Sequence, residues 1–273
     1  MAATFVVVAQ WQGSGSSRAM RLVDGAEAIR GDLPSGSTLV VEVPLEAGDE
    51  QDTGVHRLSS IALVRDRFES VLSGSTGTVI TIGGDCGVEL AAIGHVLGND
   101  IAVVWLDAHP DLNTPESSTS HAFTGMVLRT LVGDGPSALV PSTSLAASRI
   151  VLAGARDFDA AEDAFVAENG IRSIPADTVS GESLIDAVEA TGAASVYVHI
   201  DLDVLDPSDI VGLGSPEPFG VRASALVDAL KQLLERFPLA GAGITQFAPT
   251  SPADAVEDMP TILRLVGALA AAT

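Results

Sequence analysis

Carboxylate and imidazole side chains alternate in one short stretch of the chain, Trp105-Leu-Asp-Ala-His-Pro-Asp111. Asp107, His109 and Asp111 lie two residues apart, and side chains at this spacing point the same way in an extended segment. They follow the apolar run 101–106, which is typical of a buried strand. Because aspartate is rarely buried without a partner, this set of donors suits a divalent metal ion better than a packed core.

A second acidic stretch, Asp201-Leu-Asp203, follows the apolar run Val196–Ile200. If the two runs lie close together in one sheet, they gather at least four carboxylates and one imidazole. Mutual repulsion forbids so many anions unless cations neutralise them, so we predict two metal ions rather than one. A single Asp-x-Asp pair at a strand end is more often a helix cap or a solvated turn. Two acidic pairs, each directly after a predicted strand, favour metal binding instead.

Strand and helix patterns alternate along the chain, as expected for an α/β fold. Strands are predicted at Thr4–Ala9, Thr38–Val43, Thr78–Ile82, Ile101–Leu106, Ile150–Ala153, Val196–Ile200 and Ala240–Thr245. Helices are predicted at Arg57–Leu72, Val88–Leu97, Met126–Val132, Ala160–Asn169, Leu184–Thr191, Ala223–Phe237 and Pro260–Ala272. Such alternation indicates a parallel sheet covered on both faces, in which sites lie beyond the carboxyl ends of the strands. Both acidic stretches lie at such ends.

Composition limits the class of protein. The 273 residues are 47% hydrophobic, enough for one large domain or two small ones, and the apolar runs are too short to span a membrane. A net charge of −22 argues against nucleic acid or anionic membranes as partners and is compatible with a small cationic substrate. The start lacks a basic signal-peptide region, and the single cysteine suits a reducing compartment. We therefore expect a cytoplasmic protein.

The cysteine lies in Gly83-Gly-Asp-Cys86, just past a predicted strand. Free cysteines usually behave as small buried apolar residues. Its place beside the acidic stretches makes Cys86 a candidate ligand or nucleophile instead. The polar loop after Asp111, which carries hydroxyls and an amide, is a candidate for holding a polar substrate, although a solvated loop is the simpler interpretation.

These residues resemble the ureohydrolases, the family that includes arginase, agmatinase and formiminoglutamase. The resemblance depends on four motifs in order and spacing: Gly83-Gly-Asp-Cys86, Asp107-Ala-His-Pro-Asp111, Ala155-Arg-Asp-Phe-Asp159 and Asp201-Leu-Asp-Val-Leu-Asp-Pro207. It implies that residues 1–273 form a single domain, a three-layer α/β/α sandwich around a parallel sheet. It also implies a cofactor of two Mn²⁺ ions bridged by hydroxide.

The resemblance assigns the metal ligands. One ion would be held by Cys86, Asp107, Asp111 and Asp201, and the other by His109, Asp107, Asp201 and Asp203. Two neighbouring ions lower the pKa of the bridging water, and the resulting hydroxide would attack the guanidine carbon. Asp111 would then relay the proton to the departing amine.

The resemblance also indicates the substrate class. Asn113 and Ser120 match family positions that hold an α-carboxylate, and Asp159 matches one that holds an α-ammonium group. Agmatine lacks the carboxylate, so a small guanidino α-amino acid is the expected partner. The sequence does not indicate an oligomeric state.

Three positions depart from the arginase pattern. Cys86 stands where arginases carry a histidine ligand, and a soft thiolate suits Mn²⁺ less well than imidazole does. Thr124 stands where arginases carry a proton-shuttling histidine, which His121 could partly replace. Gln246 stands where the family has a glutamate that receives the guanidinium group.

Together these departures predict a less basic substrate. Hydroxylation of a guanidine nitrogen lowers its basicity. The group then depends less on a glutamate to neutralise its charge and on a histidine to shuttle its proton. This pattern resembles the branch of the family that serves D-cycloserine biosynthesis, and the resemblance implies hydrolysis of Nω-hydroxy-L-arginine to hydroxyurea and L-ornithine. L-Arginine as the substrate, a non-catalytic subunit and a cysteine-nucleophile amidinohydrolase stay open as alternatives.

Overall fold

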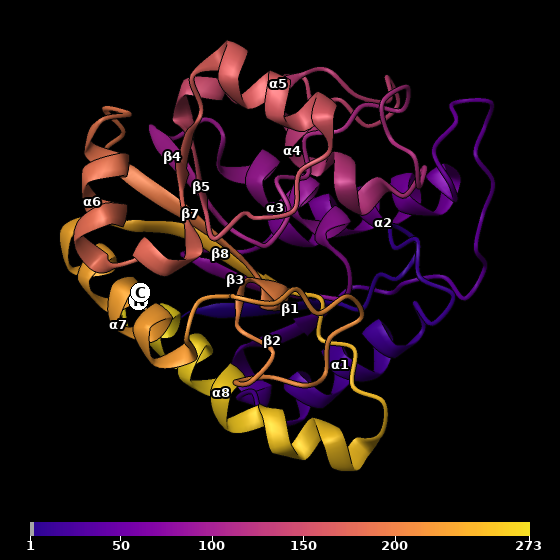
Figure 1. The fold of residues 1–273 in the computed structure, drawn as a ribbon. Helices are drawn as coiled ribbons and strands as arrows, with labels where there is room; N and C mark the ends of the chain where they lie inside the picture. The colour runs from indigo at the N-terminus through magenta and orange to yellow at the C-terminus, as the bar shows by residue number, and fades with distance from the viewer. Residues whose placement is uncertain (1–2) are drawn as a thin grey trace.

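An eight-stranded sheet forms the centre of the computed structural model, which describes residues 3–273 (Figure 1). Every strand pair is parallel, and the order across the sheet is β2-β1-β3-β8-β7-β4-β5-β6. The strands are β1 (Thr4–Val8), β2 (Thr38–Val40), β3 (Val79–Gly83), β4 (Ile101–Leu106), β5 (Ile150–Ala153), β6 (Arg172–Ile174), β7 (Ser195–Asp201) and β8 (Leu239–Thr245). Strand β4 is buried at every position, as expected of a sheet with both faces covered.

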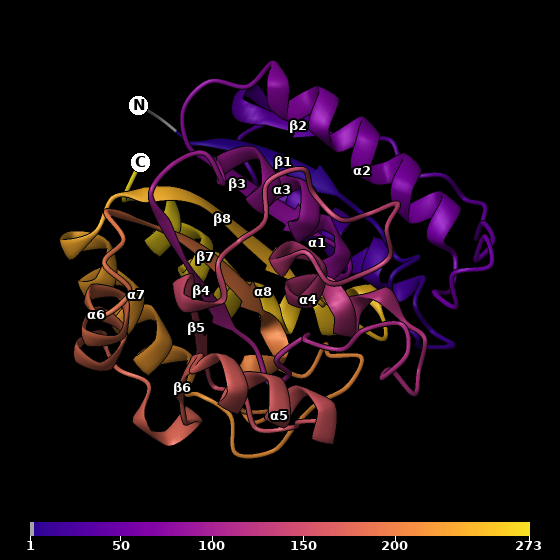
Figure 2. The same cartoon turned by 90° about the horizontal axis from the view of Figure 1, so that it is seen from above.

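Helices cover both faces of the sheet. They are α1 (Arg21–Gly31), α2 (Leu58–Ser73), α3 (Glu89–Val96), α4 (Val127–Val132), α5 (Ala160–Asn169), α6 (Gly181–Glu189), α7 (Ala223–Arg236) and α8 (Pro252–Ala270). Helices α1, α6, α7 and α8 pack on one face and α2 to α5 on the other (Figures 1 and 2). The predicted α/β/α sandwich is confirmed. Within residues 3–273, none of the helices has the length and apolar character that crossing a bilayer requires.

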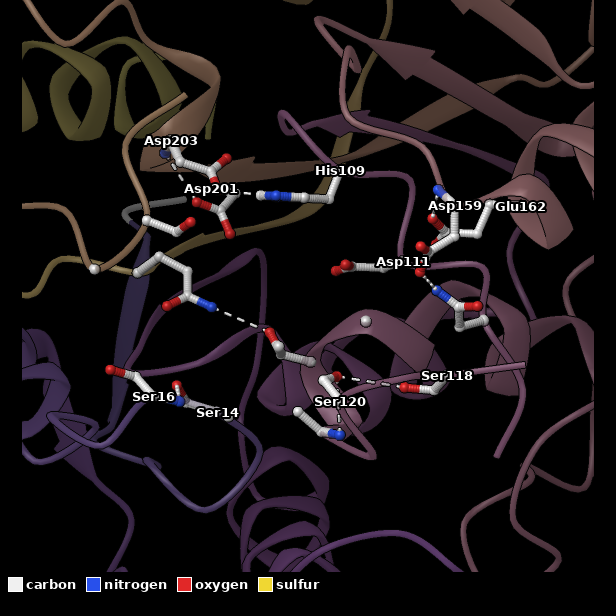
Figure 3. Close-up of a pocket in the computed structure, with 18 of the residues that line it drawn as sticks. Ser14, Ser16, His109, Asp111, Ser118, Ser120, Asp159, Glu162, Asp201 and Asp203 are labelled. Atoms are coloured by element: carbon white, nitrogen blue, oxygen red, sulfur yellow. Dashed lines mark hydrogen bonds and ion pairs between the residues drawn. The ribbon is translucent and has the colours of Figure 1, made fainter. Parts of the chain in front are cut away.

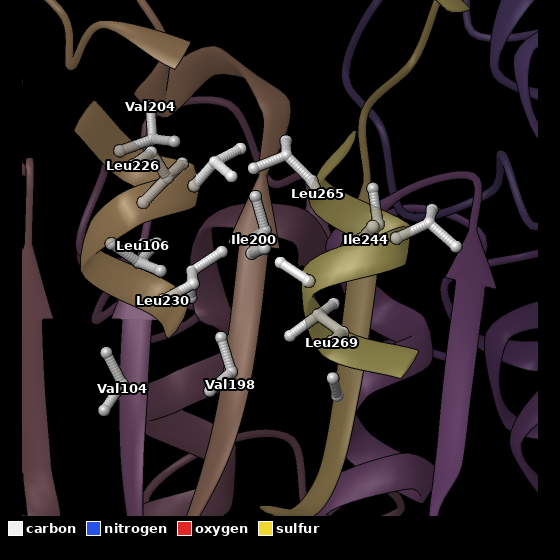
Figure 4. Close-up of a cluster of buried hydrophobic side chains, with 14 of the residues drawn as sticks. Val104, Leu106, Val198, Ile200, Val204, Leu226, Leu230, Ile244, Leu265 and Leu269 are labelled. Carbon is white, nitrogen blue, oxygen red and sulfur yellow. The ribbon is translucent and has the colours of Figure 1, made fainter. Parts of the chain in front are cut away.

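The packing of α7 and α8 onto the central strands fixes the ends of these strands (Figure 4). The side chains in this layer are fully buried; they include Val104, Val198, Ile200, Ile244, Leu226, Leu230, Leu265 and Leu269. Truncating one such leucine to alanine costs about 2–5 kcal/mol. In the parallel pairing of β4 with β7, Leu106 lies opposite Ile200. This register therefore brings the two acidic stretches to the same edge of the sheet.

Two elements are absent from the sequence-based prediction. Helix α1 buries Leu22, Gly25, Ala26 and Ile29, a helical spacing that includes two small residues and therefore has a weak apolar signal. Gly25 lies against the backbone of Phe247, where a Cβ atom would come within 1.9 Å of the carbonyl oxygen. Strand β6 has three residues at the sheet edge and is too short to show a period.

Helix α8 begins at Pro252, eight residues before the predicted start at Pro260. Ser251 caps it by accepting a hydrogen bond from the backbone N–H of Asp254, and Pro252 occupies the first turn, where it removes no helical bond. Asp258, also in these early turns, is buried and accepts hydrogen bonds from the backbone of residues 211 and 212. These tertiary contacts hold the helix through Pro260, a residue that usually interrupts one.

Candidate active site and metal centre

A polar cavity of about 480 Å³ opens where β4 and β7 end (Figure 3). Its size lies in the usual range for small-molecule sites. The lining comes from six segments far apart in sequence: Ser14 to Ser16, His109 to Gly125, Asp159 with Glu162, Asp201 with Asp203, Leu213 to Ser215, and Gln246. The position agrees with the expectation that sites of parallel sheets lie at the carboxyl ends of strands.

The end of β4 presents Asp107 and His109. Asp107 is 1% exposed, and its Oδ1 accepts a hydrogen bond from the backbone N–H of His109 at 2.7 Å. Its Oδ2 accepts one from Nε1 of Trp105 at 3.1 Å. The imidazole Nδ1 of His109 lies 3.4 Å from Asp107 Oδ1. The two carboxylate oxygens of Asp107 therefore face two different groups of neighbours.

The end of β7 presents the second pair of acids. Asp201 Oδ1 accepts a hydrogen bond from the backbone N–H of Asp203 at 2.8 Å. Asp203 joins the two strand ends, because its Oδ1 accepts from the backbone N–H of Ala108 at 3.0 Å and its Oδ2 lies 3.1 Å from His109 Nδ1. The structure thus brings together the two acidic stretches that the sequence placed at strand ends.

Cys86 follows β3 and lies beside the acids. Its thiol is 1% exposed and donates a hydrogen bond to Asp201 Oδ2 at 3.0 Å. Gln246 Nε2 lies 3.6 Å from the sulfur and donates to Thr124 Oγ1 at 3.1 Å. The three positions that depart from the arginase pattern therefore lie together, because Gln246 contacts both Cys86 and Thr124, and Thr124 and Gln246 line the cavity.

Asp111 occupies a separate part of the cavity. Its backbone adopts a positive φ of 51°, its side chain is 4% exposed, and its Oδ2 has no hydrogen-bond partner among residues 3–273. Figure 3 shows its carboxylate pointing into the cavity. The side chain lies outside the two tight groups of potential ligands described below, although we predicted it as a ligand beside Cys86.

The ligand atoms gather in two overlapping groups. One group contains Cys86, Asp107, His199 and Asp201, and the other contains Asp107, His109 and Asp203; within each group the atoms lie within 4.8 Å of one another. Asp107 belongs to both groups. Such an arrangement, with one shared carboxylate, suits two neighbouring cations.

The carboxylates in these groups are buried close together and repel one another. Burial raises the pKa of Asp201, and the charges of Asp203 and Asp107 raise it further. Burial, followed by the charge of Asp201, raises the pKa of the Cys86 thiol well above its ordinary value. Burial likewise raises the pKa of Asp111, with the charge of Asp107 adding to the effect. These acids resist ionising together, which is the electrostatic condition that a bound cation relieves.

The imidazole at the end of β4 has the opposite tendency. Burial alone would lower the pKa of His109, but its contacts with Asp107 and Asp203 raise it. Burial would raise the pKa of Asp107, but the neighbouring imidazoles of His109 and His199 lower it. A positive charge is therefore favoured between these carboxylates, whether a proton or a metal ion provides it.

The residues predicted to hold the amino-acid end of a substrate line the other wall. Asn113 Nδ2 donates to Asp159 Oδ2 at 2.8 Å, and Asn113 Oδ1 accepts from the hydroxyl of Ser117 at 2.7 Å. Asp159 is also the N-cap of α5, where it forms a capping box with Glu162. The Ser120 hydroxyl accepts from the backbone N–H of Ala122 at 3.3 Å. Asp159 therefore caps α5 and also lines the cavity, where its carboxylate lies beside Asn113.

His121 does not fit the role suggested for it. Its side chain is exposed and faces His56, with ring centroids 5.6 Å apart, and it is not among the residues that line the cavity. His121 has a positive φ of 54°, and Thr124, three residues on, lines the cavity itself. The idea that His121 partly replaces a proton shuttle is therefore not supported by its position.

The loop 13–16 is a part of the site that sequence reasoning missed. Asp85 holds it, because Asp85 Oδ2 accepts from the backbone N–H of Gly13 at 2.8 Å while Oδ1 accepts from Gln10 and Gly87. A Cβ atom on Gly13 would lie 2.4 Å from Asp85 Oδ1. Burial raises the pKa of Asp85 to about 6, although its three hydrogen bonds oppose this shift. The available signal was the Asp in Gly83-Gly-Asp-Cys86.

Comparisons with known proteins identify relatives of this arrangement. The model of the Arginase family matches residues 18–263. An arginase of Staphylococcus aureus strain MRSA252 is 28% identical over 194 residues, which cover 66% of this chain and 64% of the arginase. An N(omega)-hydroxy-L-arginine amidinohydrolase of Streptomyces lavendulae is 28% identical over 265 residues, covering 94% of this chain and 91% of that protein. The structure of Entamoeba histolytica arginase in complex with L-ornithine superposes with a TM-score of 0.87 at 22% identity, covering 98% of this chain and 97% of that one.

Proposed function

Because the chain belongs to the arginase family, we propose that it hydrolyses the guanidino group of an α-amino acid with the help of two divalent cations, Mn²⁺ in our proposal. The observation that carries the proposal is the pair of overlapping ligand groups that share Asp107 at the base of a polar cavity. The chain spans 64% of the length of the staphylococcal arginase that it matches.

The residues present fit a pair of cations. Asp107, His109 and Asp203 would hold one ion through oxygen and nitrogen donors, which suit Mn²⁺. Cys86, Asp107 and Asp201 would hold the other, with Asp111 facing it across the cavity. The unpartnered buried Oδ2 of Asp111 also indicates a positively charged neighbour. When bound, two such ions would lower the pKa of water enough to supply a nucleophile near neutral pH.

The side chains around the cavity then have separate tasks. Asn113 and Ser120 would bind the α-carboxylate, and Asp159 the α-ammonium group, which fixes the guanidine carbon over the acids. Asp111 would accept the proton that the attacking water loses, because its pKa is raised by burial and by the charge of Asp107. It would return this proton to the amine of L-ornithine as the bond between carbon and nitrogen breaks.

Nω-Hydroxy-L-arginine is the proposed substrate. An N-hydroxyguanidine is less basic than a guanidine, and the wall that would receive it carries the neutral amide of Gln246 bonded to Thr124 rather than a carboxylate and an imidazole. Similarity to the Streptomyces amidinohydrolase along 94% of the chain supports this choice. A place in D-cycloserine biosynthesis stays a prediction.

Turnover of two substrates tests the proposal. Purified protein loaded with Mn²⁺ should favour Nω-hydroxy-L-arginine over L-arginine in kcat/KM by at least about tenfold, which is about 1.4 kcal/mol of transition-state stabilisation. Asp203→Asn should abolish both activities and so assign them to this site. A preference of about tenfold or more for L-arginine would show that arginine is the substrate instead. No turnover of either compound would refute the hydrolase assignment.

A further inference from the structure

His199 is a fully buried imidazole in the middle of β7 that the predicted metal sites leave unused. It is 0% exposed and stacks on Trp105, with ring centroids 3.6 Å apart. Within residues 3–273, neither of its ring nitrogens has a hydrogen-bond partner. Burying a polar group without a partner costs about 1–3 kcal/mol. Glu89 Oε1 lies 3.2 Å from Nδ1, so Nε2 is the ring nitrogen that lacks a close partner among the described residues.

Nε2 of His199 faces the acids at the end of the sheet. It lies 3.7 Å from Asp107 Oδ2, which is too long for a hydrogen bond. Two ligands that each lie about 2.0–2.3 Å from a common cation are about 3–4 Å apart, so this distance suits shared coordination. One nitrogen of His199 also lies within 4.8 Å of donor atoms of both Cys86 and Asp201.

We propose that His199 is a ligand of the cation held by Cys86, Asp107 and Asp201. This inference rests on the proposed dimetal site and deepens it. The site would then combine thiolate, imidazole and two carboxylates, all buried, whereas the other group has no sulfur donor. Since sulfur and nitrogen donors favour softer cations, the two sites would differ in metal preference.

Glu89 holds the imidazole in the required orientation. His199 Nδ1 lies 3.2 Å from Glu89 Oε1, and Glu89 Oε2 accepts a hydrogen bond from the Tyr197 hydroxyl at 2.5 Å. Oε1 itself has no hydrogen-bond partner among the described residues. With Nε2 bound to the cation, Nδ1 would carry the proton and its N–H would face Glu89 Oε1. A carboxylate behind a ligating histidine is the usual arrangement at protein metal sites.

Space for this carboxylate is provided by a glycine. Gly243 on β8 lies opposite His199 in the sheet, and a Cβ atom there would lie 1.6 Å from Glu89 Oε1. Glu89 is 0% exposed in the first turn of α3, where the helix dipole favours its negative charge. Helix α3 and strands β7 and β8 therefore hold the buried pair Glu89 and His199, with the imidazole facing Asp107.

Counting metal-bound imidazoles tests the proposal. The protein would be labelled in its five histidines with the NMR-active nitrogen isotope and loaded with the NMR-active cadmium isotope. We expect cadmium coupling to two histidines, His109 and His199. His199→Gln should remove one coupled signal, whereas His95→Ala, which removes an exposed histidine of α3, should leave both.

A single coupled imidazole in the wild type would overturn the assignment of His199 while leaving the dimetal site intact. A wild-type protein that binds no cadmium and no Mn²⁺ would refute the proposed function itself. If His199→Gln does not fold, the count in the wild-type protein still decides. Glu89→Gln gives a second variant, in which we expect the His199 coupling to persist and the affinity of this site for metal to fall about 10- to 100-fold.

Discussion

Gln246→Glu tests whether the neutral wall of the cavity selects the substrate. The residue has a positive φ of 66°, and its backbone N–H donates to the carbonyl of Gly84 at 2.7 Å, so its position is fixed. Glutamate and glutamine have the same shape. The substitution therefore adds one negative charge where Nε2 now lies 3.1 Å from Thr124 Oγ1.

The expected size follows from the added charge. Two unit charges about 4 Å apart attract by about 4 kcal/mol at an effective dielectric of about 20, an upper bound for a partly open cavity. A hydrogen bond to a charged group contributes about 1.5–3 kcal/mol net. A cationic guanidinium should gain this interaction and a neutral hydroxyguanidine should not. The ratio of kcat/KM for L-arginine to that for Nω-hydroxy-L-arginine should therefore rise about 10- to 150-fold.

Steady-state kinetics with both substrates on Mn²⁺-loaded protein measures this ratio. Gln246→Met is the matched control, because it removes the amide without adding charge. The reasoning is wrong if the glutamate variant changes the ratio by less than about threefold, about 0.6 kcal/mol, or if the methionine variant changes it equally. Metal content must be measured in all three proteins, since the new carboxylate would also lie near Cys86.

Four further predictions concern the metals and the loops around them. Cys86→His should keep or raise Mn²⁺ content while changing activity and Cys86→Ala should lose one ion, so equal stoichiometry by elemental analysis in both variants and wild type would contradict its role as a ligand. Removing metal with a chelator should lower the melting temperature, because cations at about 100 times their Kd stabilise by about 2.7 kcal/mol each; an unchanged transition would argue against the site. Asp258→Ala should cost about 1–3 kcal/mol in urea unfolding, because the buried backbone N–H of Gly212, at 2.7 Å, and the N–H of the exposed Val211, at 3.0 Å, lose their acceptor; a cost below about 0.5 kcal/mol, the range of ordinary surface substitutions, would show that these bonds are replaced. Gly13→Ala should raise KM, since its Cβ would displace the loop from Asp85, whereas Gly31→Ala, at a glycine with open space, should leave KM unchanged; equal KM values in the two variants would refute this.

Local patterns in the sequence predicted most of the sheet and its chemistry. The buried strands before Asp107 and Asp201 are continuous apolar runs, and such runs carry a strong signal because both faces of a central strand are covered. Elements with weak local signals were missed. Helix α1 packs through small residues such as Gly25, and α8 passes through Pro260 because contacts of Asp258 hold its first turns.

The sequence by itself determined which side chains could bind metal, because Asp107, His109, Asp201 and Asp203 lie at the carboxyl ends of two buried apolar strands, where sites of parallel sheets are found. Only the tertiary structure decided which of them meet. The register of β4 against β7 places Trp105 opposite His199, which brings an imidazole from mid-strand beside Asp107. The fold of the loop after β4 leaves His121 outside the cavity. Distances between atoms of different strands depend on pairing and packing, which no local pattern of residues specifies.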